Sequence, residues 1–368
     1  MNVFPESIIL PARTLTGAGM AGRLLPECAL FGQRGLIVHG RSLVQHGVLA
    51  RILQTTPADC QVKSWEHAGG EPTLEDLDRL RMVARKHRAD WVAGVGGGSV
   101  LDLAKACAGL FHAAQAPTVY HDGTPLETPG IPFIAVPTTA GTGSEATVNS
   151  VLTNTAAQVK KSIRDPMLMA RLVLLDPDLL AHCPQSVIAH AGMDAFTQAV
   201  EAFTSRYATW MSDSLALQAV ALIAANLEAV YRDGVSEQRM GLLTGSYLGG
   251  LGFSMGRLGV VHGLAHSLGL RYHAPHGLVC GICLPYAIEL NHEAMGAKYD
   301  RLSQAVGADL LDWTRRTLDH LEMTSPFKGK ALVEKETIIK KTLPSWSTQA
   351  NPKPITAADV EWLLRRIF

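Results

Sequence analysis

The sequence predicts an N-terminal α/β domain built on a parallel sheet, followed by an all-helical C-terminal domain. In the first half, short apolar stretches at 35–40, 91–99 (a strand running into glycines) and 131–137 alternate with segments of helical spacing at 42–54, 79–89 and 101–114. Such alternation is typical of a parallel sheet with helices on both faces. From about residue 179, helical periodicity prevails and β-branched runs become scarce. We place the boundary near residues 176–178, which gives domains 1–177 and 178–368.

Composition excludes several classes of protein. The 368 residues are 47% hydrophobic and 18% charged, and no charge-free apolar run is long enough to cross a bilayer, which argues against a disordered or membrane-spanning chain. Basic and acidic residues balance at 33 each, so no charge footprint for nucleic acid or an anionic membrane is visible. We expect neither partner.

The N-terminus and the cysteines favour a cytoplasmic protein. The N-terminus carries Glu6 and lacks a basic stretch followed by a long apolar one. We therefore expect no signal peptide. Six scattered cysteines are few for this length, which favours reduced thiols. Cys280 and Cys283 have C-x-x-C spacing inside an apolar run, and we interpret them as buried structural thiols rather than a metal or redox site.

A glycine-rich turn follows the predicted strand that ends near residue 96. Gly96, Gly97, Gly98 and Ser99 open the next predicted helix, where free backbone N–H groups and the helix dipole favour an anion. Asp102 has the spacing of a reciprocal helix cap with Ser99. Lys105, one turn into the helix, is placed to add positive charge to a phosphate. The turn favours phosphate binding, with a simple tight connection as the alternative.

A second polar loop, PTTAGTGSE, follows the buried stretch 131–137. Ligands of open parallel sheets lie at the carboxyl ends of the strands. A polar turn with hydroxyl–backbone bonds is the alternative. Two such loops at two strand ends favour ligand binding, with hydroxyls for ribose, phosphate or amide groups supplied by Thr138, Thr139, Thr142 and Ser144.

The first strand, 35–40, bears on the choice between NAD and NADP. Sheets that bind NAD usually place an acid near this strand end to accept from the ribose 2′-hydroxyl, whereas an arginine suits a 2′-phosphate. Here Gly40 and Arg41 occupy that place, which leans towards NADP, although a solvated surface arginine is the plainer interpretation.

Histidines are concentrated in one short segment: His262, His266, His273 and His276 fall within 15 residues. His262 and His266 are spaced i, i+4 and share one face of a helix. Imidazoles beside a carboxylate are suited to iron or zinc, so we interpret the cluster as a divalent metal site.

A polar pair in a neighbouring apolar stretch extends this site. Asp194 lies in a nearly apolar helical segment, where a carboxylate is paired, capping or a ligand. Gln198 follows one turn later on the same face.

Together these segments resemble the iron-containing (group III) alcohol dehydrogenase family over most of the chain. GGGSVLDLAKA resembles the pyrophosphate loop and helix of that family, and PTTAGTGSEAT its second cofactor loop. DPDLL, AGMDAFTQAVEAF, VVHGLAHSLG with PHG, and NPKPITAADV follow in the family's order. The resemblance implies a nucleotide-binding N-terminal domain, a helical C-terminal domain, and a divalent metal and cofactor cleft between them.

The resemblance also assigns roles to single residues. In the family an Asp, a His one turn later and two further His hold the metal, and the matching positions here are Asp194, Gln198, His262 and His276. Gln198 departs from the family pattern, because a neutral amide is a weaker ligand than imidazole for iron or zinc. The site therefore keeps a metal, prefers a different one or has lost it, and we favour retention.

Two further positions carry over from the family. His266 matches a histidine near the metal that is linked to proton transfer. Lys160 matches a lysine near the cofactor, with Lys161 as the alternative after a one-residue shift.

The resulting hypothesis is an NAD(P)-dependent oxidoreductase that interconverts an alcohol and an aldehyde by hydride transfer at a divalent metal, with NADP favoured. The alternatives are a lyase of the dehydroquinate synthase type and a non-catalytic or metal-independent nucleotide-binding homologue. A homodimer is implied by the resemblance alone. The segment 246–258 is expected to line the substrate pocket, where Arg257 would favour an anionic aldehyde.

Overall fold

The structure, a computed structural model, describes residues 2–368 and divides them into two compact units. The α/β unit comprises Ile9–Thr139 and Ser144–Cys183. The helical unit comprises Pro184–Phe368, the short segment Ala140–Gly143 and the N-terminal residues up to Ile8.

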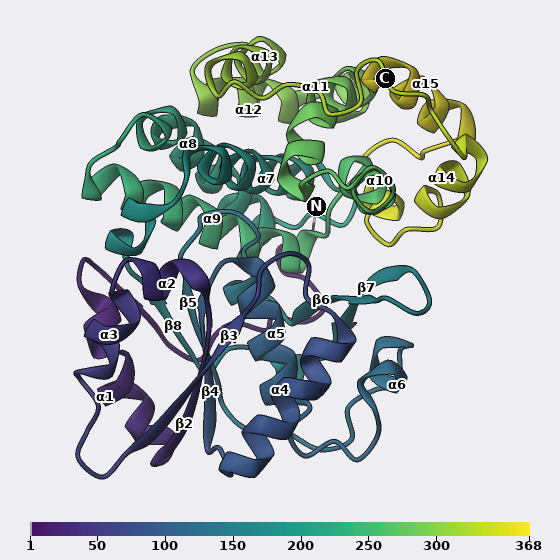
Figure 1. Cartoon of the computed structure of the whole chain (residues 1–368). Helices are drawn as coiled ribbons and strands as arrows, with labels where there is room; N and C mark the ends of the chain where they lie inside the picture. The colour runs from purple at the N-terminus through teal and green to yellow at the C-terminus, as the bar shows by residue number, and fades with distance from the viewer. Residues whose placement is uncertain (1) are drawn as a thin grey trace. The chain divides into compact units, whose positions relative to one another are not determined.

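The α/β unit is built on a six-stranded, all-parallel sheet in the order β1-β8-β5-β4-β2-β3. Helices α1 to α3 and helices α4 and α5 lie on its two sides (Figure 1). The strands are β1 (Thr14–Thr16), β2 (Arg34–Gly40), β3 (Gln61–His67), β4 (Trp91–Gly96), β5 (Phe133–Pro137) and β8 (Leu172–Leu175). The helices are α1 (Leu24–Cys28), α2 (Arg41–Gln45), α3 (Val48–Leu53), α4 (Leu74–His87), α5 (Gly98–Gly109) and α6 (Pro117–His121).

The core of this unit lies where the central strands meet the helices. Every residue of β4 and β5 is buried, as expected of parallel strands covered on both faces. At Gly94 an added Cβ would lie 2.9 Å from the Cβ of Ala104. This glycine therefore lets α5 pack directly on β4 and brings the start of α5 to the end of the strand.

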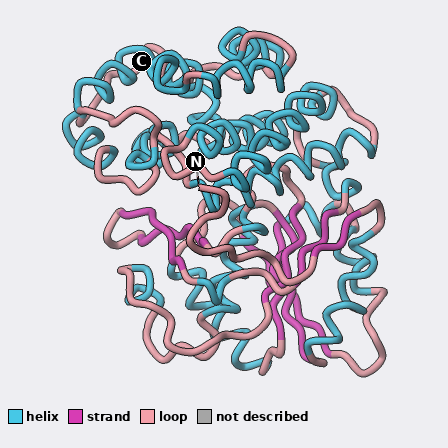
Figure 2. Tube along the Cα trace, turned by 180° about the vertical axis from the view of Figure 1, so that it is seen from behind, coloured by secondary structure: helices cyan, strands magenta, loops and turns pink. Residues whose placement is uncertain are grey.

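One local feature differs from the sequence-based expectation, and another was not predicted. The single helix expected over 42–54 is two short helices, because Gly47 between α2 and α3 adopts a left-handed conformation with φ 67°. The polar stretch after the second loop forms an antiparallel hairpin of β6 (Asn149–Asn154) and β7 (Val159–Arg164), separate from the main sheet. Figure 2 shows this hairpin as a strand pair apart from the parallel strands.

The helical unit consists of the nine helices α7–α15 and connecting turns within the described chain. They are α7 (Gln185–Thr204), α8 (Trp210–Tyr231), α9 (Ser236–Gly256), α10 (Val260–Tyr272), α11 (His276–Met295), α12 (Ala297–Val306), α13 (Leu310–His320), α14 (Lys335–Thr342) and α15 (Ala357–Ile367). Helix α7 contacts α8, α9 and α11, and its residues from Gly192 to Thr204 are all buried.

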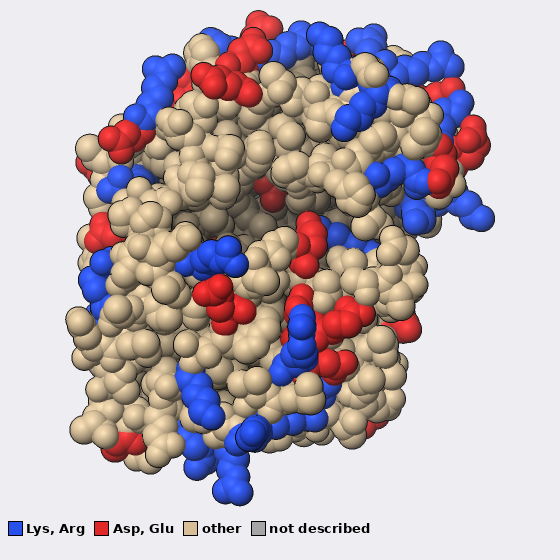
Figure 3. Space-filling view, viewed as in Figure 1, with Lys and Arg blue, Asp and Glu red and all other residues tan. Residues whose placement is uncertain are grey.

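Helix α8 is apolar enough to be tested as a membrane span. It has 22 residues, and its most apolar window has a mean hydropathy of 1.5; no other helix in residues 2–368 passes the same test. Its buried Asp213 forms an ion pair with Lys298 at 2.9 Å, and it contacts α7, α9 and α12. These contacts are those of a bundle helix. On the face seen in Figure 3, basic and acidic side chains are intermingled.

Candidate functional site

The carboxyl ends of three neighbouring strands bring the two glycine- and hydroxyl-containing loops together. Residue His39 of β2 pairs with Val95 of β4, and Gly96 pairs with Pro137 of β5. The Thr138 N–H donates to the Gly96 carbonyl at 3.0 Å. In the sheet, β2 lies between β3 and β4, so the order in which successive strands are added reverses direction at β2. Such a switch point is where open α/β sheets bind ligands.

The start of α5 has the properties of a phosphate cradle. Helix α5 begins at Gly98 just after β4, as the strand–GGGS–helix pattern predicts, and its N-cap residue is Gly97, which has no side chain to cap the first N–H groups. An added Cβ at Gly97 would touch only Thr139, at 3.4 Å. The N-terminal N–H groups of the helix, its dipole and the absence of a side chain at Gly97 together fit the pyrophosphate of a dinucleotide.

Asp102 and Lys105 do not act as the sequence suggested. Asp102 does not cap the helix with Ser99; its carboxylate accepts from Ser144 Oγ at 2.5 Å and from the Val151 N–H at 3.0 Å. Lys105 is fully buried and points away from any phosphate, because its Nζ donates to the carbonyls of Ser144, Thr147 and Asn149. These two residues fasten the second loop and the hairpin to α5.

Burial shifts the titration of this internal cluster. Burial lowers the pKa of Lys105 to about 8, although Asp102 and Glu145 oppose the shift. Burial likewise raises the pKa of the Glu145 carboxyl to about 7. Ser144, whose hydroxyl bonds Asp102 and Lys105, is also buried, so this network holds the loop from within.

The two candidate lysines of the hairpin point to different partners. Lys160 Nζ lies 2.7 Å from Glu71 Oε2, and its side chain is mostly buried. Burial raises the pKa of the Asp102 carboxyl, and the charge of Lys160 helps to lower it. Lys161 forms a more exposed ion pair with Asp122 at 2.8 Å. Adjacent strand residues point to opposite faces, so Lys160 is the one on the Asp102 side.

Three helices of the helical unit supply the candidate metal ligands. Asp194 lies on α7, His262 on α10, and His276 is the first residue of α11. Gly277 makes the approach of α11 to α7 possible, because an added Cβ would lie 2.1 Å from the His190 carbonyl and 3.2 Å from the Cβ of Asp194. The sequence PHG therefore starts a helix and places its histidine against the carboxylate.

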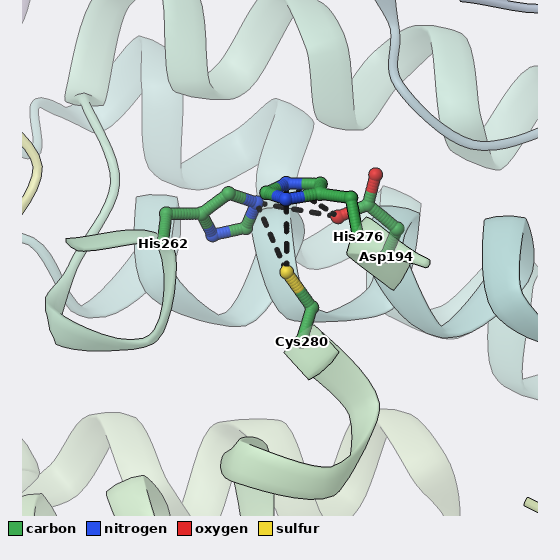
Figure 4. A group of neighbouring side chains, drawn as sticks. All are labelled: Asp194, His262, His276 and Cys280. Carbon is green, nitrogen blue, oxygen red and sulfur yellow. Dashed lines mark hydrogen bonds and ion pairs between the residues drawn. The ribbon is translucent and has the colours of Figure 1, made fainter. Parts of the chain in front are cut away.

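The donor atoms of this cluster converge closely (Figure 4). Asp194 Oδ1 lies 3.3 Å from His262 Nε2 and 3.8 Å from His276 Nε2. A fourth donor, Cys280 Sγ, lies 3.6 Å from His276 Nε2 and 3.8 Å from His262 Nε2. All four ligand atoms are within 4.8 Å of one another, and only His276 is more than slightly exposed.

Glu201 orients His262 from behind. Its Oε2 accepts from His262 Nδ1 at 2.6 Å, and its Oε1 accepts from the Val261 N–H at 2.7 Å, in the first turn of α10. This contact fixes the proton on Nδ1. The Nε2 atom, which faces Asp194, then carries the lone pair that can bind a metal. Carboxylates that orient ligating histidines in this way are typical of metal sites.

The electrostatics suit a cation. Burial acts to raise the pKa of the Asp194 carboxyl, but His276 and His262 outweigh it and hold that pKa below its usual range. Burial disfavours a charged His262, yet Cys280, Glu201 and Asp194 together raise the pKa of His262 well above its ordinary value. A cluster that draws a proton this strongly also attracts a divalent ion, so we expect protons and metal to compete for it.

Gln198 provides a further test of whether these residues are suited to hold a divalent metal. It lies one turn after Asp194 on α7, and its buried Oε1 accepts no hydrogen bond from any residue in 2–368. A buried amide oxygen without a donor is costly unless something else bonds it. The converging donors and this unsatisfied oxygen both fit a bound divalent metal.

Of the two remaining histidines, His266 lies beside the donor cluster and His273 does not. The ring of His266, one turn after His262, stacks on His276 with centroids 5.1 Å apart, so it adjoins the donor cluster. His273 is exposed and ends α10 in a left-handed conformation with φ 51°. It is therefore a helix-terminating residue, and the sequence cluster of four reduces to three.

Arg257 stacks on aromatic rings within the protein. Its guanidinium lies over the rings of Tyr207 and Trp346, with centroids 3.8 and 4.5 Å away. This stacking, at a residue with φ 67° that ends α9, accounts for its charge without a substrate carboxylate.

Sequence reasoning missed Glu201 and Cys280. Glu201 lies seven residues after Asp194, so it continues the same helical face, and that spacing was the available signal. Cys280 lies one turn after His276, but this relation appears only once the helix is known to start at His276. The C-x-x-C pair is thus divided between a thiol in the donor cluster, Cys280, and a buried thiol outside it, Cys283.

Comparison with known proteins identifies the family. The sequence profile "Iron-containing alcohol dehydrogenase" matches residues 11–177, and "Fe-containing alcohol dehydrogenase family, C-terminal" matches residues 188–368. Lactaldehyde reductase of Escherichia coli is 34% identical over 307 residues, covering 82% of this chain and 79% of its own length. Sulfoacetaldehyde reductase of Bilophila wadsworthia is 34% identical over 284 residues, covering 77% and 72%.

A solved structure agrees with the sequence relatives. The crystal structure of a 1,3-propanediol oxidoreductase superposes with a TM-score of 0.93 and 26% identity, over 100% of both chains. Nothing in these matches favours a lyase or a non-catalytic homologue. The chain belongs to the iron-containing alcohol dehydrogenase family and is an NAD(P)-dependent oxidoreductase that interconverts alcohols and aldehydes.

Proposed function

We propose that this chain is an NADP-preferring alcohol dehydrogenase and aldehyde reductase that retains a divalent metal, iron or zinc. Asp194, His262 and His276 hold the metal, with the Gln198 amide as a neutral further donor. The observation that carries the proposal is that Asp194 Oδ1 lies 3.3 and 3.8 Å from the Nε2 atoms of His262 and His276.

The chemistry divides between the bound groups and the chain. When bound, the dinucleotide supplies or accepts hydride, and the metal polarises the substrate oxygen as a Lewis acid. Asp194 stays ionised and balances positive charge. Glu201 keeps His262 in the Nδ1–H form, so that its Nε2 remains a donor.

His266 is the residue we assign to proton transfer. It is half-buried beside His276, at the edge of the donor cluster. Imidazole titrates near neutrality and can pass a proton between the substrate oxygen and solvent in either direction.

The dinucleotide is proposed to bind the α/β domain of residues 1–177, with the metal in the helical domain 178–368. Gly97 and the start of α5 receive the pyrophosphate, while Asp102 and Ser144 support the loop from beneath. The remaining cofactor contacts are proposed for Gly40, Gly96, Gly98, Ser99, Thr138, Thr139, Thr142 and Lys160.

Arg41 is proposed to recognise the 2′-phosphate. It follows β2 directly, is well exposed, and pairs with exposed Glu66 only at 3.6 Å, a contact of small energetic weight. We expect Arg41→Ala to lower kcat/KM for NADPH by about tenfold or more and to leave that for NADH nearly unchanged, because a charge-assisted hydrogen bond is lost. Arg51→Ala, at an exposed arginine of α3, is the control. Equal losses with both cofactors would exclude this role.

Metal removal tests the proposal as a whole. Elemental analysis of purified protein is expected to find iron or zinc, and a chelator should abolish NADPH-linked aldehyde reduction until metal is restored. A Gln198→His variant, analysed in parallel, should bind metal more tightly. Metal-free wild type, with metal and activity gained only in that variant, would mean that the chain has abandoned metal-dependent chemistry.

We further propose a cytoplasmic homodimer. The homodimer rests on the likeness to the family alone. Light scattering coupled to gel filtration would distinguish a dimer from a monomer.

A further inference from the structure

The separations between the donor atoms of the cluster are close to those of a tetrahedral zinc site that includes a sulfur. With bond lengths of about 2.0 to 2.1 Å to nitrogen or oxygen and about 2.3 Å to sulfur, tetrahedral ligands lie about 3.3 Å apart for nitrogen or oxygen pairs and about 3.6 Å apart for sulfur–nitrogen pairs. Here Asp194 Oδ1 lies 3.3 Å from His262 Nε2 and 3.8 Å from His276 Nε2, and Cys280 Sγ lies 3.6 and 3.8 Å from the two Nε2 atoms. Cys280 thus supplies the fourth donor atom of the cluster.

The position of Cys280 on its helix explains why it points into the cluster. His276 and Cys280 are spaced i, i+4 on α11, so their side chains lie on one face. Figure 4 shows the sulfur directed at both imidazoles. Cys283, three residues further along, is equally buried but lies outside the cluster.

Cys280 is also a better ligand than Gln198. Thiolate is a soft, anionic donor that selects zinc among the metals available to a nitrogen and oxygen site, whereas a neutral amide adds little. Asp194 and a Cys280 thiolate together carry two negative charges, which match one divalent ion between neutral imidazoles.

We propose that Cys280 Sγ, in place of the Gln198 amide, is the fourth metal ligand of this protein and that the site therefore selects zinc over iron. The inference rests on the proposed function in one respect, namely that a metal occupies this cluster. On binding, the thiol releases its proton to solvent and a sulfur lone pair forms the bond to the metal. A metal held by these four residues would still be able to polarise a substrate oxygen, because catalytic zinc sites permit a fifth ligand.

The test uses cobalt(II) as a spectroscopic substitute for zinc in the full-length protein. Metal-free protein reconstituted with Co²⁺ is expected to show a near-ultraviolet thiolate-to-cobalt charge-transfer band. X-ray absorption of the zinc form should show one sulfur scatterer at about 2.3 Å. Both measurements use the wild type, so they decide the question even if a variant fails to fold.

Variants assign the band to one thiol. Cys280→Ser should lose the band. Its affinity for zinc should fall by roughly tenfold to hundredfold or more, since this is the loss that removing an outer-shell partner already causes. Cys283→Ser, the matched control, should retain both the band and zinc affinity. In competition between equimolar Zn²⁺ and Fe²⁺ without oxygen, the wild type should take up zinc.

The outcomes separate the two proposals. Bound cobalt without a charge-transfer band, or a Cys280→Ser variant that keeps it, would overturn the assignment of Cys280 and leave the metal centre standing. Preferential uptake of iron would overturn the zinc selectivity. Failure of the wild type to bind cobalt, zinc or iron would remove the metal centre and the ligand assignment together.

Discussion

Replacing Asp194 by asparagine is expected to remove most of the catalytic activity while leaving the fold intact. Asparagine keeps the shape of the side chain but not its charge, and this carboxylate lies between the two Nε2 atoms of the cluster. Loss of several kcal/mol of Lewis-acid stabilisation corresponds to a fall of roughly a thousandfold in kcat/KM. The measurement is NADPH-linked aldehyde reduction together with the metal content of the purified variant.

The control for Asp194→Asn is an exposed carboxylate of the same unit. Asp300 lies on the surface of α12, so Asp300→Asn should change neither metal content nor kcat/KM. Intact NADPH binding by Asp194→Asn would show that the loss is confined to the helical unit. Near-normal activity of Asp194→Asn would contradict the assignment of this carboxylate as a ligand.

The second large effect is expected at Glu201, which the sequence analysis did not single out. In Glu201→Gln the amide no longer offers a charged acceptor to His262 Nδ1, and the N-terminal turn of α10 loses its carboxylate at the Val261 N–H. Outer-shell partners of ligating histidines contribute roughly tenfold to hundredfold to metal affinity. We therefore expect the apparent Kd for Zn²⁺, measured against a competing chelator, to rise by about that factor.

The chain contains a matched pair for this experiment. Glu228 accepts from His320 Nδ1 at 3.0 Å, but this pair lies at the surface. Glu228→Gln makes the same chemical change away from the donor cluster and should leave zinc affinity unaltered. If both variants bind zinc like the wild type, Glu201 supports the fold rather than the metal.

Much of the architecture follows from local sequence patterns. The strands ending at Gly40, Gly96 and Pro137 were predictable because parallel strands buried on both faces are continuous apolar runs followed by glycine or polar turns. Helix boundaries were harder to predict. The break between α2 and α3 depends on one glycine whose left-handed conformation is compatible with, but not required by, the sequence.

The roles of Asp102 and Lys105 were mispredicted for a physical reason. Spacing along α5 gives the face on which a side chain lies but not what covers that face. The segment from Ser144 to Val151 folds over this face and supplies acceptors for the ammonium and donors for the carboxylate. Both charges are thereby consumed inside the protein, and no local pattern indicates this.

The sequence by itself determined the α/β-then-helical organisation and the two loops at strand ends, because periodicity and residue type are local properties. Asp194, His262 and His276 were selected as a ligand set through the resemblance to the family. Only the tertiary structure decided that Glu201 orients His262 and that Cys280 joins the cluster. Those contacts link α7, α10 and α11, and the distance between side chains on different helices depends on how closely the backbones pack. Gly277 sets that approach for α11 and α7, since any larger residue would collide with the His190 carbonyl.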